Sequence, residues 1–318
     1  MTLQQLRQVL TIAESNSMNE AAKKLFVSQP NLSATVREVE EELGITVFMR
    51  NNRGITVTAE GEEFLGYAKQ VVEQYHLLEN RYLNVESKKK FSVSMQHYSF
   101  AVKAFVQLAK EVGMDEYEFA VHETKTKEVI DNVKNLKSEI GVLYLSDFNE
   151  KVLRKLFKEC DIEFKELFTC NTYVYLWKKH PLAGQKEITL DDLQEYPCLT
   201  FEQGVNNSFY YAEEMMSTYE YKRVIKADDR ATMLNLMVGL NGFTLCSGII
   251  SEDLNGDDYA AIPLKESEKM HIGYIKHKGT KLSKLGEIYI DALKNYENKV
   301  LYCLLYTSPS PRDKRQSR

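Results

Sequence analysis

Residues 18–61 read MNEAAKKLFVSQPNLSATVREVEEELGITVFMRNNRGITVTAEG, and this stretch decides the fold of the N-terminal part of the chain. Ser28 is a favoured N-cap, and Pro30 falls in the first turn of the helix that follows, where its missing N–H costs no hydrogen bond. That helix ends at Gly44, and apolar residues recur along one face of it. They are Leu32, Val36, Val39 and Leu43. A shorter helix over residues 18–26 precedes it and is expected to turn four apolar side chains inward: Ala21, Ala22, Leu25 and Phe26.

Two short helices joined by a tight turn are typical of a helix-turn-helix, and the flanking sequence extends this prediction in both directions. Upstream, residues 3–15 place five apolar side chains on one face of a further helix: Leu3, Leu6, Val9, Leu10 and Ala13. Downstream, strand-like runs at residues 45–48 and 55–57 flank the turn Asn51-Asn52-Arg53-Gly54. Such a hairpin is the wing of a winged helix-turn-helix.

The face of the second helix opposite its apolar side carries side chains that suit the edges of DNA bases. Glutamine can bond an adenine edge twice, serine can bond a base or a phosphate, and small side chains fit the thymine methyl group. Arginines at the wing are placed to hold phosphates. The predicted DNA-binding residues are Gln29, Pro30, Asn31, Ser33, Ala34, Arg37, Arg50 and Arg53. A purely structural helical module is the alternative, because residues 1–60 are not basic overall and the acidic side chains within 38–42 must point away from DNA.

A long helix is predicted from residue 59, with Thr58 as its N-cap and three lysines at 88–90 near its end. Its apolar residues recur with alternating spacings of four and three, which is the heptad pattern of a coiled coil. This seam consists of Phe64, Ala68, Val71, Tyr75, Leu78, Tyr82 and Val85. It either packs on its own domain or pairs with a second copy of the chain, and the strict period of 3.5 residues favours pairing. A dimer would also place two reading helices on two half-sites of DNA.

The N-terminal stretch also resembles the DNA-binding domain of LysR-type transcriptional regulators. Motif elements of that family occur in order and at family spacing: A-A-x-x-L from Ala21, S-Q-P-x-x-S from Ser28, L-G from Leu43, F-x-R from Phe48 and T-x-E-G from Thr58. The resemblance implies a homodimer or homotetramer that binds double-stranded promoter DNA. It also implies activation more than pure repression, with RNA polymerase as a further partner.

After residue 90, strands and helices alternate, which is typical of a parallel, doubly wound sheet. Strands are expected at residues 91–95, 117–122, 140–145, 172–177, 198–201, 223–227, 242–247 and 269–277. Helices are expected at residues 99–112, around 129–136, after 189, from about 208, through 236 and at 281–297. The pattern indicates two α/β lobes, lobe 1 at about 91–165 and 266–300, and lobe 2 at about 166–265.

Two segments of this half are also similar to the LysR family: HPLAGQKEITLDDLQEYPCLTF at 180–201 and VGLNGFTLCSGIISEDL at 238–254. The family implies an effector domain built like a periplasmic binding protein, with a small molecule between the lobes. The expected fold is therefore an all-α winged helix-turn-helix (1–58), a coiled-coil linker and dimerisation helix (59–90), and an α/β two-lobed effector-binding domain (91–300).

Effector-binding residues are expected where strands end and helices begin, since ligands of open α/β sheets bind beyond the carboxyl ends of the strands. The candidates are Gln96, His97, Tyr98, Ser99, Thr124, Thr200, Phe201 and Ser247. Thr126 follows the same strand as Thr124. Hydroxyl groups and helix N–H groups suit a carboxylate or another small anion. The alternative is that these polar residues only cap their helices.

Composition excludes several other classes of protein. The chain has 318 residues, 43% of them hydrophobic, and a net charge of -5, so it is not a polycation. Five cysteines without a C-x-x-C pair predict neither a disulfide scaffold nor a zinc knuckle. Without a run of 18 apolar residues or a basic leader, we expect no membrane span, no signal peptide and a cytoplasmic protein. The usual catalytic and nucleotide-binding motifs are missing, so we expect no enzyme, cofactor or metal.

Three alternatives stay open at this point. A solute-binding or transport component could share the two-lobe fold, and an enzyme could be fused to a DNA anchor. Cys246, at a strand end, could sense oxidation or be buried and inert. Residues 301–318 form a basic tail that reads as disordered, and CLLYTSPSPRD within it resembles the translated read-through of a sequencing adapter.

Overall fold

The computed structural model describes residues 1–15, 17–51, 54–82, 88–113, 116–206, 208–250 and 252–296. The chain divides into two compact units, Met1–Lys88 and Lys89–Arg318, each of which is described by itself. Among the described residues, no helix combines the length and the apolar character needed to cross a membrane. The predicted tail at 301–318 lies outside the described residues.

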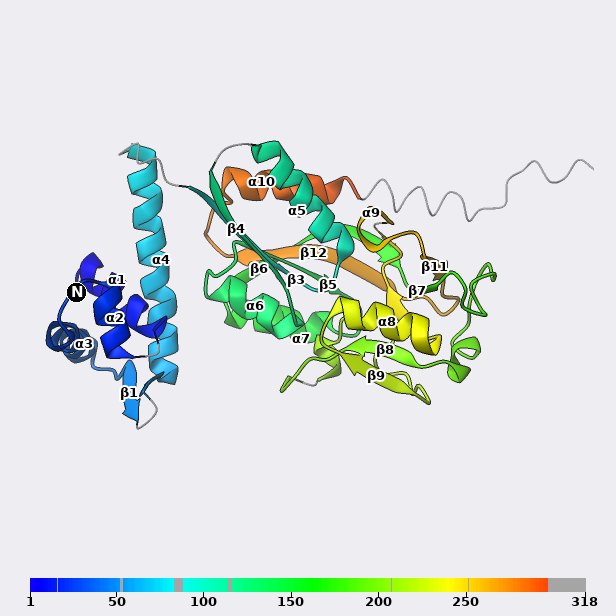
Figure 1. Cartoon of the computed structure of the whole chain (residues 1–318), viewed down its shortest axis with the longest axis horizontal. Helices are drawn as coiled ribbons and strands as arrows, with labels where there is room; N and C mark the ends of the chain where they lie inside the picture. The colour runs from blue at the N-terminus through cyan, green and yellow to red at the C-terminus, as the bar shows by residue number, and fades with distance from the viewer. Residues whose placement is uncertain are drawn as a thin grey trace, which may run out of the picture. The chain divides into compact units, whose positions relative to one another are not determined.

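Unit 1 is a winged helix-turn-helix followed by one long helix (Figure 1). Its elements are α1 (Leu3–Ala13), α2 (Met18–Lys24), α3 (Gln29–Leu43), β1 (Phe48–Asn51), β2 (Gly54–Val57) and α4 (Ala59–Tyr82). As predicted, Ser28 caps α3 by accepting a hydrogen bond from the backbone of Asn31, and Gly44 ends it in the left-handed conformation with φ 69°. The buried side of α3 contributes Leu32, Val36 and Val39 to a core shared with α1 and α2.

The first wing strand begins three residues later than predicted. The side-chain oxygen Oε1 of Glu40 accepts hydrogen bonds from the backbone N–H groups of Val47 (2.7 Å) and Phe48 (3.0 Å). These bonds hold the backbone at Val47 and Phe48 against α3. The antiparallel pairing with β2 therefore starts only at Phe48. The prediction of a hairpin is confirmed, whereas its first boundary is wrong.

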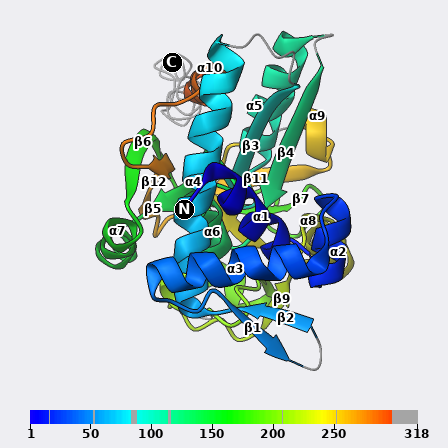
Figure 2. The ribbon, with the colours of Figure 1, turned by 90° about the vertical axis from the view of Figure 1, so that its left-hand side faces the viewer.

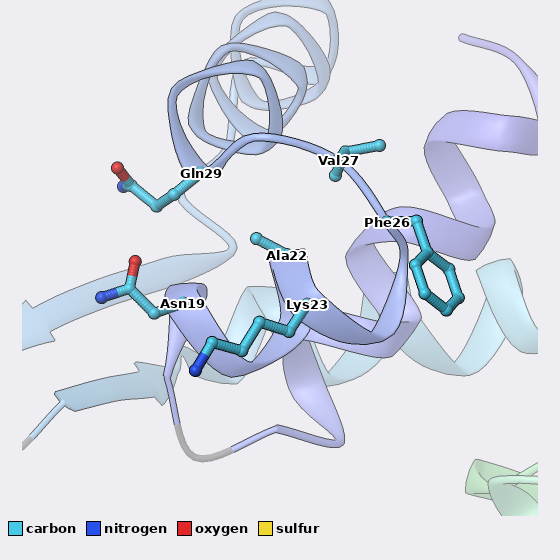
Figure 3. Close-up of a pocket in the computed structure, with 6 residues that line it drawn as sticks. All are labelled: Asn19, Ala22, Lys23, Phe26, Val27 and Gln29. Carbon is cyan, nitrogen blue, oxygen red and sulfur yellow. The ribbon is translucent and has the colours of Figure 1, made fainter.

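Phe26 is the clearest correction in unit 1. It was expected to point inward, but 96% of its surface is exposed. The residue follows the end of α2 with φ 54°, and this left-handed turn points its ring away from the core (Figure 3). Ala13 and Leu43, also expected to be buried, lie at the last position of their helices and are exposed.

In unit 2, lobe 1 is built on a five-stranded sheet in the order β4-β3-β5-β12-β6. The strands are β3 (Lys89–Met95), β4 (Tyr117–Glu123), β5 (Ile140–Leu145), β6 (Ile162–Asn171) and β12 (Lys269–His277). On one face of the sheet lie α5 (Ser99–Val112) and α10 (Lys284–Lys294), and on the other α6 (Thr126–Lys134) and α7 (Glu150–Glu159) (Figure 1). The strand and helix expected at the end of the chain thus join lobe 1.

The sheet of lobe 1 is only partly parallel. β3 pairs in parallel with β4 and β5, as a doubly wound sheet requires. β12 runs antiparallel to both β5 and β6, so the expectation of a wholly parallel sheet is wrong. Both β6 and α7 were missed from the sequence. Because β6 continues to Asn171 within lobe 1, the expected change of lobe at about residue 165 comes too early.

Lobe 2 holds an antiparallel sheet, β10-β7-β11, and a parallel pair, β8-β9. These elements are β7 (Tyr173–Trp177), β8 (Cys198–Phe201), β9 (Val224–Ala227), β10 (Thr244–Cys246) and β11 (Tyr259–Pro263), with helices α8 (Arg230–Leu240), α9 (Glu252–Asn255) and the short 3-10 helix η1 (Asp192–Glu195). Neither β11 nor α9 was expected. The helix expected from about residue 208 is also wrong, because only the 3-10 turn η2 (Phe209–Tyr211) forms there.

Candidate functional site

The outward face of α3 is the first candidate site, and Figure 2 looks onto this helix with the hairpin of β1 and β2 beside it. Four of the predicted DNA-binding side chains on α3 are exposed: Pro30, Asn31, Ala34 and Arg37. Gln29 and Ser33 are half-buried, and the Gln29 side-chain amide donates a 2.9 Å hydrogen bond to the Ser33 hydroxyl. This bond holds two polar side chains, one helical turn apart, on the same side of α3.

Acidic side chains near this face are held by partners within unit 1. Glu38 accepts a 3.0 Å hydrogen bond from Gln5, and Glu42 pairs with the amino group of Met1. Glu40 binds the backbone before the wing, as described above. These contacts draw the three carboxylates toward the N-terminus and the wing base, which fits the expectation that they point away from DNA.

A pocket beside α3 adds residues that the sequence did not single out. It is lined by Asn19, Ala22, Lys23, Phe26, Val27 and Gln29. In Figure 3 the side chains of Asn19, Lys23 and Gln29 extend toward the same side, away from Phe26. Asn19 and Lys23 come from α2, so only the packing of α2 against α3 brings them beside Gln29. At the wing, Arg53 and the side chain of Arg50 lie outside the described residues.

The seam predicted on α4 divides between two environments. Ala68 is buried against Leu6 of α1, together with Val72, which was not part of the seam, and Phe64 packs beside them. Val71 and Leu78 remain 51% and 55% exposed. The half-exposed ring of Tyr75 lies under the guanidinium of Arg7, 5.4 Å from its centre. The side chain of Tyr82 and the whole of Val85 lie outside the described residues.

The position of these residues around α4 explains the division. The side that faces α1 carries Phe64, Ala68 and Val72, whereas Val71 and Leu78 lie at its margin with Tyr67, which is 57% exposed. An apolar strip on a long helix that its own domain leaves uncovered is typical of a surface that binds a partner. We call Tyr67, Val71 and Leu78 the α4 strip.

The second candidate site lies where the two lobes of unit 2 meet. Residues 202–206 and 208–216, which follow β8, make several contacts with lobe 1, and we call them the crossing segment. Its Met215 belongs to the core of lobe 1. The backbone carbonyls of Tyr211 and Ala212 accept hydrogen bonds from the hydroxyls of Thr126 (2.7 Å) and Tyr144 (3.0 Å) of lobe 1. The region where an effector was expected therefore contains direct contacts between lobe 1 and this segment.

Glu213 of the crossing segment contacts the start of α5. Its Oε2 atom accepts a 2.9 Å hydrogen bond from the backbone N–H of His97 and lies 2.8 Å from Nδ1 of the same residue. Its Oε1 atom accepts a 2.9 Å bond from the Gln203 side-chain amide. The ring of Phe201 stacks on the imidazole of His97, with 3.7 Å between ring centres. Two predicted effector residues, His97 and Phe201, thus meet around a carboxylate that the sequence analysis missed.

Gln96 connects this contact to the rest of lobe 1. Its side-chain oxygen accepts hydrogen bonds from the Tyr98 hydroxyl (2.9 Å) and the backbone of Tyr144 (3.2 Å). Its amide donates a 2.6 Å bond to Thr126, whose backbone N–H in turn bonds Gln203 at 3.1 Å. Gln96, Tyr98 and Thr126 therefore serve in one buried network that extends into the crossing segment.

Glu214, next to Glu213, is also buried. Its Oε1 atom accepts a 2.8 Å hydrogen bond from the backbone N–H of Phe201. Burial and the neighbouring Glu213 carboxylate raise the pKa of Glu214 to about 8. At neutral pH this carboxyl is therefore mostly protonated, so the adjacent pair does not place two full charges in the protein interior.

Four other predicted effector residues do not join this network. Thr124 lines a separate surface pocket of lobe 1 with His122, Glu128 and Lys137. Thr200 lies within the β8–β9 pair, Ser99 is buried in the first turn of α5, and Ser247 is buried after β10, where its hydroxyl accepts a bond from the backbone of Ile249. Ser247 thus stabilises the turn after β10 and does not cap a helix, because α9 begins only at Glu252.

The residues missed from the sequence are Tyr144, Gln203, Glu213 and Glu214. The local sequence around the two glutamates predicts no site, because residues 208–216, SFYYAEEMM, read as a helix with an exposed acidic pair. One signal was available: two adjacent glutamates between tyrosines and methionines are unusual on a solvated helix, because such apolar neighbours favour burial.

Cysteine and metal chemistry receive no support from the described residues. Burial raises the pKa values of Cys170 and Cys246 to about 12, so both stay as thiols near neutral pH. In the part of the chain that the structure describes, no three histidine, cysteine or acidic side chains are grouped so as to hold a metal ion.

Two family models match the chain on either side of the linker. One, the bacterial regulatory helix-turn-helix protein, lysR family, matches residues 3–62. The other, the LysR substrate binding domain, matches residues 96–297, which is more than half of the chain. The two matches cover the unit that presents α3 and the unit that holds the inter-lobe network.

Individual relatives agree with these matches. The transcriptional regulator CysL of Bacillus subtilis is 26% identical over 309 residues, which cover 93% of this chain and 98% of CysL. A full-length OxyR variant from Pseudomonas aeruginosa has the same fold, with a TM-score of 0.68 at 19% identity over 92% of this chain and 95% of that one. Full-length LysG from Corynebacterium glutamicum, solved with its effector Arg, has a TM-score of 0.61 at 13% identity over 94% and 99% of the two chains.

The winged helix-turn-helix with its exposed α3 face, the two-lobed α/β unit and both family matches lead to one conclusion. The chain belongs to the LysR family of bacterial transcriptional regulators, with a helix-turn-helix DNA-binding domain and an effector-binding domain, and it is not an enzyme.

Proposed function

We propose that α3 and the wing read the operator sequence through the residues predicted for this role. The proposed contacts are Gln29, Pro30, Asn31, Ser33, Ala34, Arg37, Arg50 and Arg53. The observation that carries this proposal is the outward face of α3, where a hydrogen-bonded Gln29 and Ser33 lie beside exposed Asn31 and Arg37. Polar groups that are held in place and remain accessible match what direct reading of bases in the major groove requires.

Alanine at Gln29 or Ser33 tests this reading face. Each variant is expected to bind its operator roughly 5- to 150-fold more weakly, because a specific base contact contributes about 1–3 kcal/mol of discrimination. Binding to unrelated DNA should change little, since phosphate contacts remain. Gel-shift titrations with operator and scrambled DNA measure both affinities. Gln4→Ala, at an exposed glutamine of α1, is the matched control; equal losses in control and variant would contradict the assignment.

The oligomer is proposed to form through α4. LysR regulators are oligomeric, and the seam residues proposed for pairing are Val71, Tyr75, Leu78, Tyr82 and Val85, whereas Phe64 and Ala68 of the predicted seam pack against α1. The exposed Val71 and Leu78 support this role most directly, and Tyr67 joins them on the α4 strip. We propose residues 1–58 as the reading domain, 59–90 as the linker and 91–300 as the two-lobed effector domain, in a regulator that acts in the cytoplasm and contacts RNA polymerase at activated promoters.

The effector is proposed to bind where the lobes meet. The residues assigned to it are Gln96, His97, Tyr98 and Phe201, and the contact between His97 and Phe201 is the part that the geometry supports best. The other four predicted residues, Ser99, Thr124, Thr200 and Ser247, lie outside this network. A small carboxylate or similar anion fits the donor groups at the start of α5. A thermal-shift screen against amino acids, sulfur metabolites and small carboxylates tests this, because a ligand raises the unfolding midpoint by mass action.

A further inference from the structure

Donor groups near the N-terminus of α5 already hold a carboxylate, and it belongs to the chain itself. His97 offers its backbone N–H and its ring Nδ1 to Oε2 of Glu213, and Gln203 offers its amide to Oε1. A carboxylate can only accept, so Nδ1 carries the donated proton. Both oxygens of Glu213 thus have donors: two groups of His97 in lobe 1 at Oε2, and one from Gln203 of the crossing segment at Oε1.

The surroundings of this carboxylate are those of a built binding site. The side chains of Glu213 and His97 are 4% and 7% exposed. Phe201 covers the imidazole by stacking on it. Tyr98, at the N-cap position of α5, makes no side-chain cap. A negative group close to this helix end is favoured by the helix dipole.

We propose that this is a carboxylate-binding site in which Glu213 acts as an intramolecular ligand, so that a free carboxylate binds there only when Glu213 leaves. The effect of this site on regulation rests on the proposed function, whereas the carboxylate-binding site itself does not. The crossing segment is anchored to lobe 1 by Thr126 and Tyr144, which keeps Glu213 at a high effective concentration beside His97. An anionic effector therefore has to compete with Glu213, and its binding would release one link between the lobes.

The charge balance at the site supports competition rather than joint binding. Glu214 lies next to Glu213, and burial together with that neighbouring carboxylate raises the pKa of Glu214, so a further negative group is unfavourable here. A free carboxylate bound beside Glu213 would have to share the same three donor groups, which Glu213 already occupies. One carboxylate at a time satisfies these donors.

The test replaces Glu213 with alanine in the full chain and uses acetate as the probe. Unfolding of unit 2 is followed by the fluorescence of Trp177, the single tryptophan of the chain, which lies in β7. The variant should unfold roughly 5–10 °C lower than the parent protein, because three donors lose a buried partner. Acetate, compared with chloride at equal ionic strength, should raise the unfolding temperature of the variant again. Half of this rise is expected at an acetate concentration of about 1–100 mM.

Two controls separate a specific site from a general salt effect. Glu220→Ala removes an exposed glutamate shortly after the crossing segment and should show no acetate-specific shift. Glu213→Gln keeps the side-chain volume and one acceptor oxygen, so the site stays filled and acetate should again have no specific effect. An alanine variant that responds to acetate no more than these controls would overturn the proposal.

If Glu213→Ala does not fold without added acetate, its refolding yield becomes the test. Glu213→Ala would then be refolded in acetate and in chloride, and a higher folded yield in acetate is expected; equal yields contradict the proposal. DNA binding separates the inference from the function on which it rests. If acetate stabilises the variant but leaves its operator affinity unchanged, the carboxylate site stands and its assignment as the effector site fails. If acetate has no effect while operator binding persists, only the inference fails.

Discussion

The double substitution Val71→Glu and Leu78→Glu is expected to convert the protein to a monomer and to lower operator affinity by about 100- to 10,000-fold. The loss follows because two linked reading heads bind two half-sites with an avidity that one head cannot reach. Both side chains are about half exposed in unit 1, so the substitution should leave its fold intact. Sedimentation measures the mass, and gel-shift titration measures the affinity.

The double substitution Lys69→Glu and His76→Glu is the matched control for this variant. These two residues are also seven positions apart on α4, but at 100° per residue they lie on a different side from the α4 strip. The control should remain an oligomer and keep its operator affinity. An unchanged mass in the Val71 and Leu78 variant would show that the α4 strip does not join the copies.

The unfolding free energy of the parent protein is expected to decrease as pH rises, and the substitution Glu214→Gln should remove most of this decrease. The folded-state pKa of about 8 lies above the usual 4.5 of a glutamate. The protonated form therefore favours folding in full below about pH 4.5, and this contribution is lost as pH rises to about 8. The shift corresponds to a loss on the order of a few kcal/mol of unfolding free energy over that range.

Glutamine stays neutral at every pH and keeps an oxygen that can accept the hydrogen bond from Phe201. At pH 8 the variant should therefore be more stable than the parent protein, while at pH 5 the two should be similar. Urea unfolding of unit 2, followed by Trp177 fluorescence at pH 5, 6.5 and 8, measures this difference. Glu220→Gln, at an exposed site, should keep the parental slope. The same slope in the Glu214 variant would contradict a neutral, buried carboxyl.

Much of unit 1 could be predicted because its signals are local. Ser28 and Gly44 mark both ends of α3, and the spacing of Leu32, Val36 and Val39 fixes its buried face. Phe26 was misjudged because the helical period does not show where a left-handed turn ends the helix. Val71 was placed in a seam by its spacing, but which of Val71 and Val72 is covered depends on the packing of α1 against α4.

In unit 2 the order of strands was largely predictable, whereas the partners of the site were not. The alternation of strands and helices does not reveal that β12 inserts antiparallel between β5 and β6. His97 was found because it follows a strand and precedes a helix. Glu213 is 116 residues away in sequence, and only the path of the crossing segment brings it to His97. Contacts of this kind depend on tertiary structure and leave no short-range pattern.

The most direct test of the account as a whole is footprinting of the full chain on genomic fragments that it captures from a digest. The account predicts two protected half-sites whose centres are separated by about 10 base pairs or a multiple of this. The Gln29→Ala and Ser33→Ala variants should need roughly 5- to 150-fold more protein for the same protection. Uniform binding that is abolished by moderate salt and protects no common sequence would contradict a sequence-specific regulator.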